Sequence, residues 1–360
     1  MQPRDRMLAA LELKQPDRVP VWELAFNEES IIGIARNFTS DVPPIKQASE
    51  MTLEEKIQLF EAMCTLVEEL DLDGITLLPL GQREKVGENL IRDELGVVLR
   101  LSDHGSPYPV DGPIRNASDL KTFKLGTPDP AELMGLHYAI QKFKGRRAIV
   151  FHTPGTFKLS WSLRGAMENL LLDYLTQPKL VRDLARMTTD YCMEFHAMAI
   201  DAGAEVIALE GDLAFNTNSL MSPAHYAEFI GPYHKEIVDN VHRKGAKIFK
   251  HSDGNLWPIL DMLLDCGFDG IHPIQPQCMD IGEVKRHLAG KACVMGNIDC
   301  MYLLCEGTTT EVEEAVRTTI EAAAPGGGYI MSSSNSIHPG CKPENYIAMV
   351  HAARRFGRYD

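Results

Sequence analysis

The sequence predicts an α/β fold, a (β/α)8 barrel of the TIM type, and three observations favour it. From about residue 145 onward, short apolar runs alternate with long amphipathic segments, which is the pattern of strands followed by helices. The chain holds eight such strand candidates, the number that the barrel requires. A doubly wound sheet is the alternative, but the sequence lacks the glycine-rich phosphate turn expected after the first strand of that fold.

The strand candidates are short apolar runs that end in polar or turn residues. Two lie early in the chain and six in the alternating part: 18–23, 74–79, 148–153, 205–210, 247–250, 270–274, 292–297 and 328–333. In such a barrel all strands end at the same side, where the active site lies.

The helices are predicted from their end signals. Thr52 with Glu55, and Thr308 with Glu311, each form the pattern of a capping box ahead of apolar residues at helical spacing. Ser222 before a proline starts a further helix, which is expected to run unbroken to Gly245. The apolar stripes of these helices are predicted core faces.

Between residues 81 and 133 the alternation stops, and polar turns with a hairpin around 97–100 and 108–110 are expected instead. We interpret this stretch as an insertion over the barrel mouth, and the residues before the first strand as an N-terminal extension. The whole chain, 1–360, is therefore expected to form a single domain.

Composition excludes several classes of function. The formal net charge is −14 and no dense run of Lys and Arg occurs, which argues against nucleic acid and anionic membranes as partners. No apolar run of 18 residues or signal-like start is present, so a cytoplasmic location is expected. The 8 cysteines form no CxxC pair and are expected to be reduced thiols.

The turn after the strand at 247–250 is the most informative local feature. His251 and Asp253 stand two residues apart, so an extended backbone puts both side chains on one face, where they could bind one divalent metal. The alternative is a polar strand end in which Asp253 caps the helix that opens at residues 255–257.

Polar residues follow several other strands and would gather at the same end of the barrel. Taken singly they have ordinary explanations: His272 could be a core histidine, and Asp212 could cap a helix. Taken together they favour a catalytic pocket: His152, Glu210, Asp212, His251, Asp253, His272, Asn297, Asp299 and 333–335. Cys341, in the loop after the last strand, could add a thiolate, and thiolate, imidazole and carboxylate together suit Zn2+.

The chain resembles the uroporphyrinogen decarboxylase superfamily, and within it the branch of cobalamin-dependent methyltransferases. The resemblance spans nearly the whole chain and rests on the His251 turn and six other segments: 18–21, 93–97, 296–299, 325–329, 339–341 and 343–345. Two features of the decarboxylases are missing. No Arg-Gln-Ala-Gly-Arg stretch follows Glu23, and a glycine, Gly74, stands at the position of their catalytic Asp.

The methyltransferases of this branch bind zinc through His-x-Cys and a later Cys, and here the matching pattern is His251-x-Asp253 with Cys341. The resemblance thus implies zinc held by His251, Cys341 and Asp253, with Glu210 as a fourth ligand or as the acid/base. A carboxylate in place of a thiolate makes the zinc a stronger Lewis acid, which suits an oxygen substrate.

The implied function is transfer of a methyl group between a small substrate, such as a methyl ether or an alcohol, and a corrinoid. The sequence has no Asp-x-His-x-x-Gly corrinoid motif, so the corrinoid would belong to a separate protein. Catalytic roles are expected for Glu210, Asp253, Asn297 and His152, and a homodimer is expected from the same resemblance. The alternatives are a decarboxylase-like lyase acting without metal and a non-catalytic binding subunit.

Overall fold

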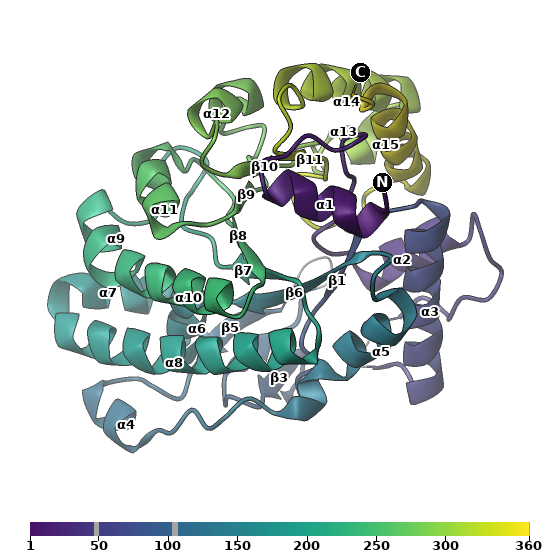
Figure 1. Ribbon diagram of the computed structural model, residues 1–360. Helices are drawn as coiled ribbons and strands as arrows, with labels where there is room; N and C mark the ends of the chain where they lie inside the picture. Colours follow the sequence, from purple (N-terminus) through teal and green to yellow (C-terminus); the bar gives the residue numbers. More distant parts are fainter. Residues whose placement is uncertain (47–49, 103–106, 360) are drawn as a thin grey trace. The chain divides into compact units, whose positions relative to one another are not determined.

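The computed structural model describes residues 1–46, 50–102 and 107–359 (Figure 1). These residues form two compact units. The first unit contains Met1–Thr76, Phe143–Ile149 and Asp269–Asp360, and the second contains Leu77–Lys142 and Val150–Phe268. Each unit combines stretches that are distant in sequence, so the division does not follow two consecutive domains. The expectation of one domain over 1–360 stays a prediction.

The second unit is built on parallel strands, each followed by helices. Strands β6 (Ala148–Pro154), β7 (Val206–Glu210) and β8 (Lys247–His251) pair in that order and in parallel. The residues of β7 are buried until Glu210, so its polar end marks the edge of the core. The helices of this part are α6 (Thr156–Leu163), α7 (Met167–Thr176), α8 (Pro178–Ala202), α9 (Pro223–Phe229), α10 (Gly231–Arg243), η3 (Trp257–Ile259) and α11 (Leu260–Cys266). Helices α8 and α10 lie side by side (Figure 1).

The predicted helix from Ser222 to Gly245 is two helices, and the expectation of an unbroken one was wrong. Ser222 does cap its start, since its side chain accepts a bond of 3.1 Å from the His225 N–H. The helix ends at Ile230, where φ −128° and ψ −50° leave the helical region. Pro232 explains the break, because a proline inside a helix lacks the N–H and clashes with the carbonyl one turn earlier.

The insertion in the second unit is a four-stranded antiparallel sheet, ordered β2 (Arg83–Gly87), β3 (Leu90–Asp93), β4 (Val98–Arg100) and β5 (Tyr108–Asp111). The predicted hairpin is confirmed as β4 and β5, while the connection at 103–106 lies outside the described residues. Strand β2 was not predicted, because its residues are mostly charged and exposed and show no apolar alternation. Helices α4 (Ala117–Thr122), η2 (Pro130–Leu133) and α5 (Met134–Phe143) follow.

The first unit contains β1 (Gly74–Leu77) and the parallel strands β9 (Gly270–His272), β10 (Cys293–Met295) and β11 (Tyr329–Ile330). The predicted strand at 18–23 is extended but forms only isolated bridges. The Trp22 N–H donates to the Met331 carbonyl at 3.0 Å, and the Val21 carbonyl accepts from the Asp73 N–H at 2.7 Å. A continuous ladder is prevented by Pro20, which has no N–H to donate.

All eight predicted strands are therefore extended segments at their predicted places, and the α/β fold of the (β/α)8 type is confirmed. The helices of the first unit are α1 (Pro3–Leu11), α2 (Glu28–Ala35), α3 (Leu53–Glu69), α12 (Ile281–His287), α13 (Leu303–Glu306), α14 (Thr309–Ala323) and α15 (Pro343–Phe356). Both predicted capping boxes are present, at the starts of α3 and α14. No helix among the described residues is long and apolar enough to cross a membrane.

The carboxylate of Asp73 anchors the N-terminal segment of the first unit. It is fully buried and forms ion pairs with Arg6 at 2.5 Å and Arg18 at 3.0 Å, and it accepts from the Val21 N–H at 2.7 Å. Two cations and a backbone donor compensate the loss of hydration of this charge. Asp73 therefore has a structural role.

Glu23 is a second buried carboxyl in this unit, and it predicts a pH dependence of stability. It accepts hydrogen bonds from the Ser333 hydroxyl at 2.7 Å and from the N–H groups of Ser333 and Leu24 at 3.2 Å. Burial nevertheless raises the pKa of Glu23 to about 8 from 4.5. The folded protein therefore holds a proton that the unfolded chain releases between these values, so this group's contribution to stability falls as pH rises from 4.5 to about 8.

We expect Glu23→Gln to remove that slope, which is worth on the order of 4 kcal/mol across the interval. Denaturant unfolding at pH 5 and pH 8 measures it. If the stability difference between the two pH values is the same in both proteins, Glu23 is not the group that titrates.

Candidate functional site

Two acidic residues and a histidine meet at the ends of β7 and β8 in the second unit. Asp212 lies two residues beyond β7, His251 is the last residue of β8, and Asp253 lies two residues beyond it. The Nε2 atom of His251 is 3.9 Å from an Asp212 carboxylate oxygen and 4.0 Å from an Asp253 carboxylate oxygen. One ligand atom from each residue lies within 4.8 Å of the other two. His251 and Asp253 therefore lie in one group of possible metal ligands, as predicted, and Asp212 is a third member of that group.

Hydrogen bonds fix the two loops to each other. The Ser252 hydroxyl accepts from the Leu213 N–H at 2.9 Å, and the Asp253 N–H donates to an Asp212 carboxylate oxygen at 3.0 Å. The N–H of Trp257, at the following helix start, donates to the side chain of Asn255 at 3.1 Å. The side chain of Asn255 therefore accepts a hydrogen bond at this turn, and the Asp253 N–H ties the end of β8 to Asp212.

Electrostatics keep the imidazole of His251 neutral. Burial, with the nearby His152 and Lys250, lowers the pKa of His251 to about 3. A neutral imidazole is the form that ligates a metal. His251 therefore needs no deprotonation at neutral pH before it can bind an ion.

Lys250 is buried beside His251 and organises the backbone. Its ammonium donates to the carbonyls of Leu209 at 3.3 Å, Gly211 at 2.7 Å and His251 at 2.5 Å. Burial lowers its pKa to about 8, so it remains mostly protonated at neutral pH. Its three protons are directed to these three carbonyls, which fits a role in holding the ends of β7 and β8 together.

Glu210 and His152 border the group. The Lys158 ammonium lies 3.3 Å from Glu210 and 4.6 Å from the ring centre of Trp161. Burial alone would raise the pKa of Glu210, but its charged neighbours, Lys158 foremost, outweigh burial and the pKa is lowered. Glu210 is thus an ionised carboxylate.

The ring of His152 lies 6.4 Å from that of His251, at an interplanar angle of 80°. Its Nε2 atom is shielded from solvent and has no hydrogen-bond partner among the described residues. Burial lowers the pKa of His152, which keeps the ring neutral. A polar atom of this kind in a polar site is available to hydrogen-bond a substrate or a water molecule.

Zinc fits the donor set of Asp212, His251 and Asp253. Zinc bonds to nitrogen and oxygen are about 2.0–2.2 Å long, so tetrahedral ligands lie roughly 3.3–3.5 Å apart. The observed separations of 3.9 and 4.0 Å would have to shorten by about half an ångström, a side-chain adjustment. One imidazole and two carboxylates leave a fourth position open for a substrate.

The remaining predicted residues lie in the first unit and have partners there. His272 is fully buried, and its Nε2 lies 3.1 Å from the Ser332 hydroxyl, as expected of a core histidine. The Asn297 side chain donates to the Ile274 carbonyl at 2.8 Å. Asp299 accepts from the Met301 N–H at 2.8 Å. Cys341 is buried, which raises the pKa of its thiol, and its neighbours are Cys305 and His338.

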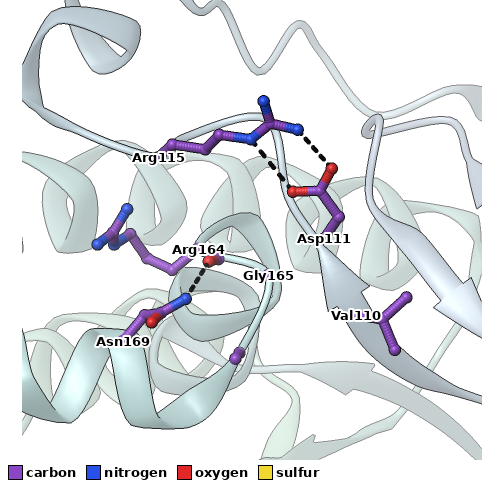
Figure 2. A pocket seen from close by; sticks show the side chains of 7 residues that line it. Val110, Asp111, Arg115, Arg164, Gly165 and Asn169 are labelled. Atoms are coloured by element: carbon purple, nitrogen blue, oxygen red, sulfur yellow. Dashed lines mark hydrogen bonds and ion pairs between the residues drawn. The ribbon is translucent and has the colours of Figure 1, made fainter.

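A surface cavity of about 300 Å3 in the second unit contains none of the predicted site residues. It lies by the end of β5 and the turn between α6 and α7 (Figure 2). Arg115 pairs with Asp111 at 2.5 Å, and the buried Arg164 pairs with Asp173 at 2.7 Å. The cations here are neutralised within the protein, which gives no reason to place a ligand in this cavity.

Comparison with known proteins identifies the family. The profile of the family Uroporphyrinogen decarboxylase (URO-D) matches residues 90–356. This chain belongs to the uroporphyrinogen decarboxylase family. A uroporphyrinogen decarboxylase of Coxiella burnetii is 26% identical to the chain over 375 residues, covering 98% of this chain and 95% of the relative.

Two methyltransferases also match this member of the uroporphyrinogen decarboxylase family. The methylcobamide:CoM methyltransferase MtaA of Methanosarcina barkeri is 23% identical over 354 residues, covering 97% of this chain and 96% of the relative. A solved structure of a methyltransferase from Methanosarcina mazei superposes with a TM-score of 0.72 at 20% identity, covering 99% of both chains. That likeness supports the shared fold, and the family includes both decarboxylases and methyltransferases.

Proposed function

We propose that this chain is a zinc-assisted methyltransferase that moves a methyl group between a small substrate and a separate corrinoid protein. The observation that carries the proposal is the group of Asp212, His251 and Asp253, whose ligand atoms lie within 4.8 Å of one another at the ends of β7 and β8. A methyltransferase of methylcobamide among the relatives supports the same reaction class.

The chain's own residues would divide the work as follows. Asp212, His251 and Asp253 would hold the zinc, which would supply a Lewis acid for the substrate oxygen or sulfur. The ionised Glu210 would accept the proton of a thiol when the corrinoid is the methyl donor. When an ether or alcohol is the methyl donor, the leaving oxygen would take a proton from solvent. The orphaned Nε2 of His152 hydrogen-bonds the substrate and orients it.

The corrinoid is proposed to arrive on a partner protein, since no corrinoid motif occurs in the sequence. A methyl ether or an alcohol is the proposed substrate class, because a nitrogen and oxygen donor set leaves the metal a stronger Lewis acid than thiolates would. The wider ligand set that includes Glu210 and Cys341 stays a prediction, as do Asn297 as a catalytic residue and the homodimer.

A decarboxylase is the second candidate, favoured by relatives of that name at up to 27% identity. A porphyrinogen carries many carboxylates and needs free cations to bind them. In the second unit, however, Lys158 is paired with Glu210 and Lys250 is bound to three carbonyls. Carbon dioxide release from a porphyrinogen in the absence of any corrinoid would favour this candidate.

Asp253→Cys tests the role of the second carboxylate. We expect the variant to bind zinc as tightly as the unaltered protein or more tightly. Its turnover of an ether or alcohol should fall about tenfold or more, and its turnover of a thiol should rise. Bound zinc, melting temperature and rates with both substrate types measure this. If Asp253 is instead only a cap, the variant loses on the order of 1 kcal/mol of stability while its zinc content stays unchanged.

A further inference from the structure

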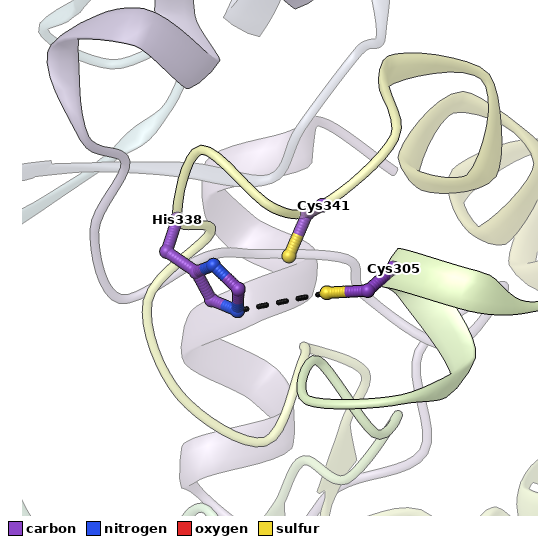
Figure 3. Close-up of side chains that lie close together, drawn as sticks. All are labelled: Cys305, His338 and Cys341. Atoms are coloured by element: carbon purple, nitrogen blue, oxygen red, sulfur yellow. Dashed lines mark hydrogen bonds between the residues drawn. The ribbon is translucent and has the colours of Figure 1, made fainter. Parts of the chain in front are cut away.

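Three metal-binding side chains lie together in the first unit, in the loops that follow β10 and β11 (Figure 3). Cys305 belongs to the short helix α13, and His338 and Cys341 belong to the loop between β11 and α15. The Cys305 sulfur is 3.7 Å from the Nε2 atom of His338. One ligand atom from each of the three residues lies within 4.8 Å of the other two. The three side chains point toward one another in Figure 3.

These side chains all turn toward one backbone carbonyl. The Cys300 oxygen is 3.1 Å from the Cys305 sulfur, 3.4 Å from the Cys341 sulfur and 3.0 Å from the His338 Nε2. A carbonyl oxygen has two lone pairs, so it accepts from two of these groups at once, and the Cys305 and Cys341 thiols also hydrogen-bond each other. The three side chains thus converge on one small region, where both thiols could release their protons and bind a cation.

We propose that Cys305, His338 and Cys341 form a second zinc site, additional to the group around His251. Two thiolates and one imidazole are a ligand set that zinc prefers, and the fourth position can be taken by water or by the Cys300 carbonyl. Binding releases two thiol protons to solvent, and the two thiolates then balance the charge of the ion. In this assignment Cys341 binds the second zinc, whereas the sequence analysis placed it in the ligand set of His251.

One contact has to change when the ion binds. The Gly340 N–H donates to the Nδ1 atom of His338 at 3.1 Å, so the imidazole proton resides on Nε2. Ligation through Nε2 transfers that proton to Nδ1 and opens the Gly340 bond. A single hydrogen bond between neutral groups is weak beside three bonds to zinc, so the exchange favours the ion.

The burial of the ligands suits a structural ion that still has an entry path. Cys305 and Cys341 are 9% and 5% exposed, whereas His338 is half-buried. The ion reaches the thiolates past the imidazole. Once bound, it adds to the hydrogen bonds that already join α13 to the loop that precedes α15, such as the bond of 2.9 Å from the Lys342 N–H to the Leu304 carbonyl.

Cobalt titration of the metal-free, full-length chain under reducing conditions tests this site. Co2+ bound by thiolates shows an intense sulfur-to-cobalt charge-transfer absorption, which nitrogen and oxygen ligands do not produce. We expect this absorption in the unaltered protein and in His251→Ala, and its loss in Cys305→Ser. His338→Gln should weaken Co2+ binding by at least about a hundredfold, more than the loss of a residue that only hydrogen-bonds a metal ligand does. Cys278→Ser, outside both groups, is the matched control and should behave as the unaltered protein.

Each other outcome overturns the proposal. Absence of the charge-transfer absorption in the unaltered protein shows that no cysteine binds the ion. Its survival in His338→Gln at full affinity shows that this histidine is not a ligand, even if Cys305→Ser does not fold. Its loss in His251→Ala assigns Cys341 to the His251 site instead. Failure here leaves the methyltransferase proposal standing, because that proposal rests on Asp212, His251 and Asp253.

Discussion

His251→Ala is expected to lower the methyl-transfer kcat/KM at least about a thousandfold, which corresponds to roughly 4 kcal/mol of transition-state stabilisation. The physical reason is that His251 supplies the one nitrogen of its group, and two carboxylates alone are a poor zinc site. The zinc content should fall by about one ion per chain at the same time. Metal analysis and steady-state kinetics measure both effects.

His242→Ala is the control for this experiment, because His242 is an exposed histidine on α10 outside both metal-binding groups. It should leave zinc content and rate within error of the unaltered protein. Full zinc content together with full activity in His251→Ala would contradict the assignment of the site. Full zinc content with lost activity would show instead that His251 contacts the substrate and not the metal.

Gly254→Ala is expected to destabilise the protein by on the order of 4 kcal/mol, an unusually large effect for one methyl group. Gly254 has φ +89°, a region that side chains disfavour, and an added Cβ would lie 2.6 Å from the backbone of Ala214. Neither backbone can yield without moving the loops that carry Asp212 and Asp253. Chemical denaturation measures the loss.

Gly245→Ala separates the two causes of that loss, the disfavoured backbone conformation and the clash of the added Cβ. Gly245 has φ +82° but an added Cβ there would meet nothing within 4 Å, so only the backbone preference is lost, worth about 1–2 kcal/mol. An equal loss in both variants would show that the close approach of Gly254 to Ala214 does not constrain the site. A clearly larger loss in Gly254→Ala is the result that the structure predicts.

The sequence predicted the places of the strands because a buried parallel strand is a short apolar run, and such runs stop where the polar ends begin. The run 247–250 and the turn at His251 are a clear example. Successive side chains of an extended backbone point to opposite faces, which is enough to put His251 and Asp253 on the same face. The helix break at Ile230 was also readable from Pro232, but the continuous apolar stripe outweighed it.

Contacts between distant residues could not be read in the same way. Asp212 joins His251 only because β7 and β8 are neighbours and Ser252 ties their loops together. Cys305 and His338 are 33 residues apart, and only the position of α13 brings them into contact. The sequence does contain a pattern that points to Asp212, since Glu210-x-Asp212 at the end of the preceding strand has the same spacing as His251-x-Asp253.

Absorption spectroscopy of cobalamin is the most direct test of methyl transfer to a corrinoid at the His251 group. Free cob(I)alamin, standing in for the corrinoid of the partner protein, is mixed with the zinc-loaded chain and a panel of methyl ethers and methanol. We expect conversion of cob(I)alamin to methylcobalamin with at least one donor, and no conversion with His251→Ala. No conversion with any donor, together with carbon dioxide release from a porphyrinogen, would contradict it.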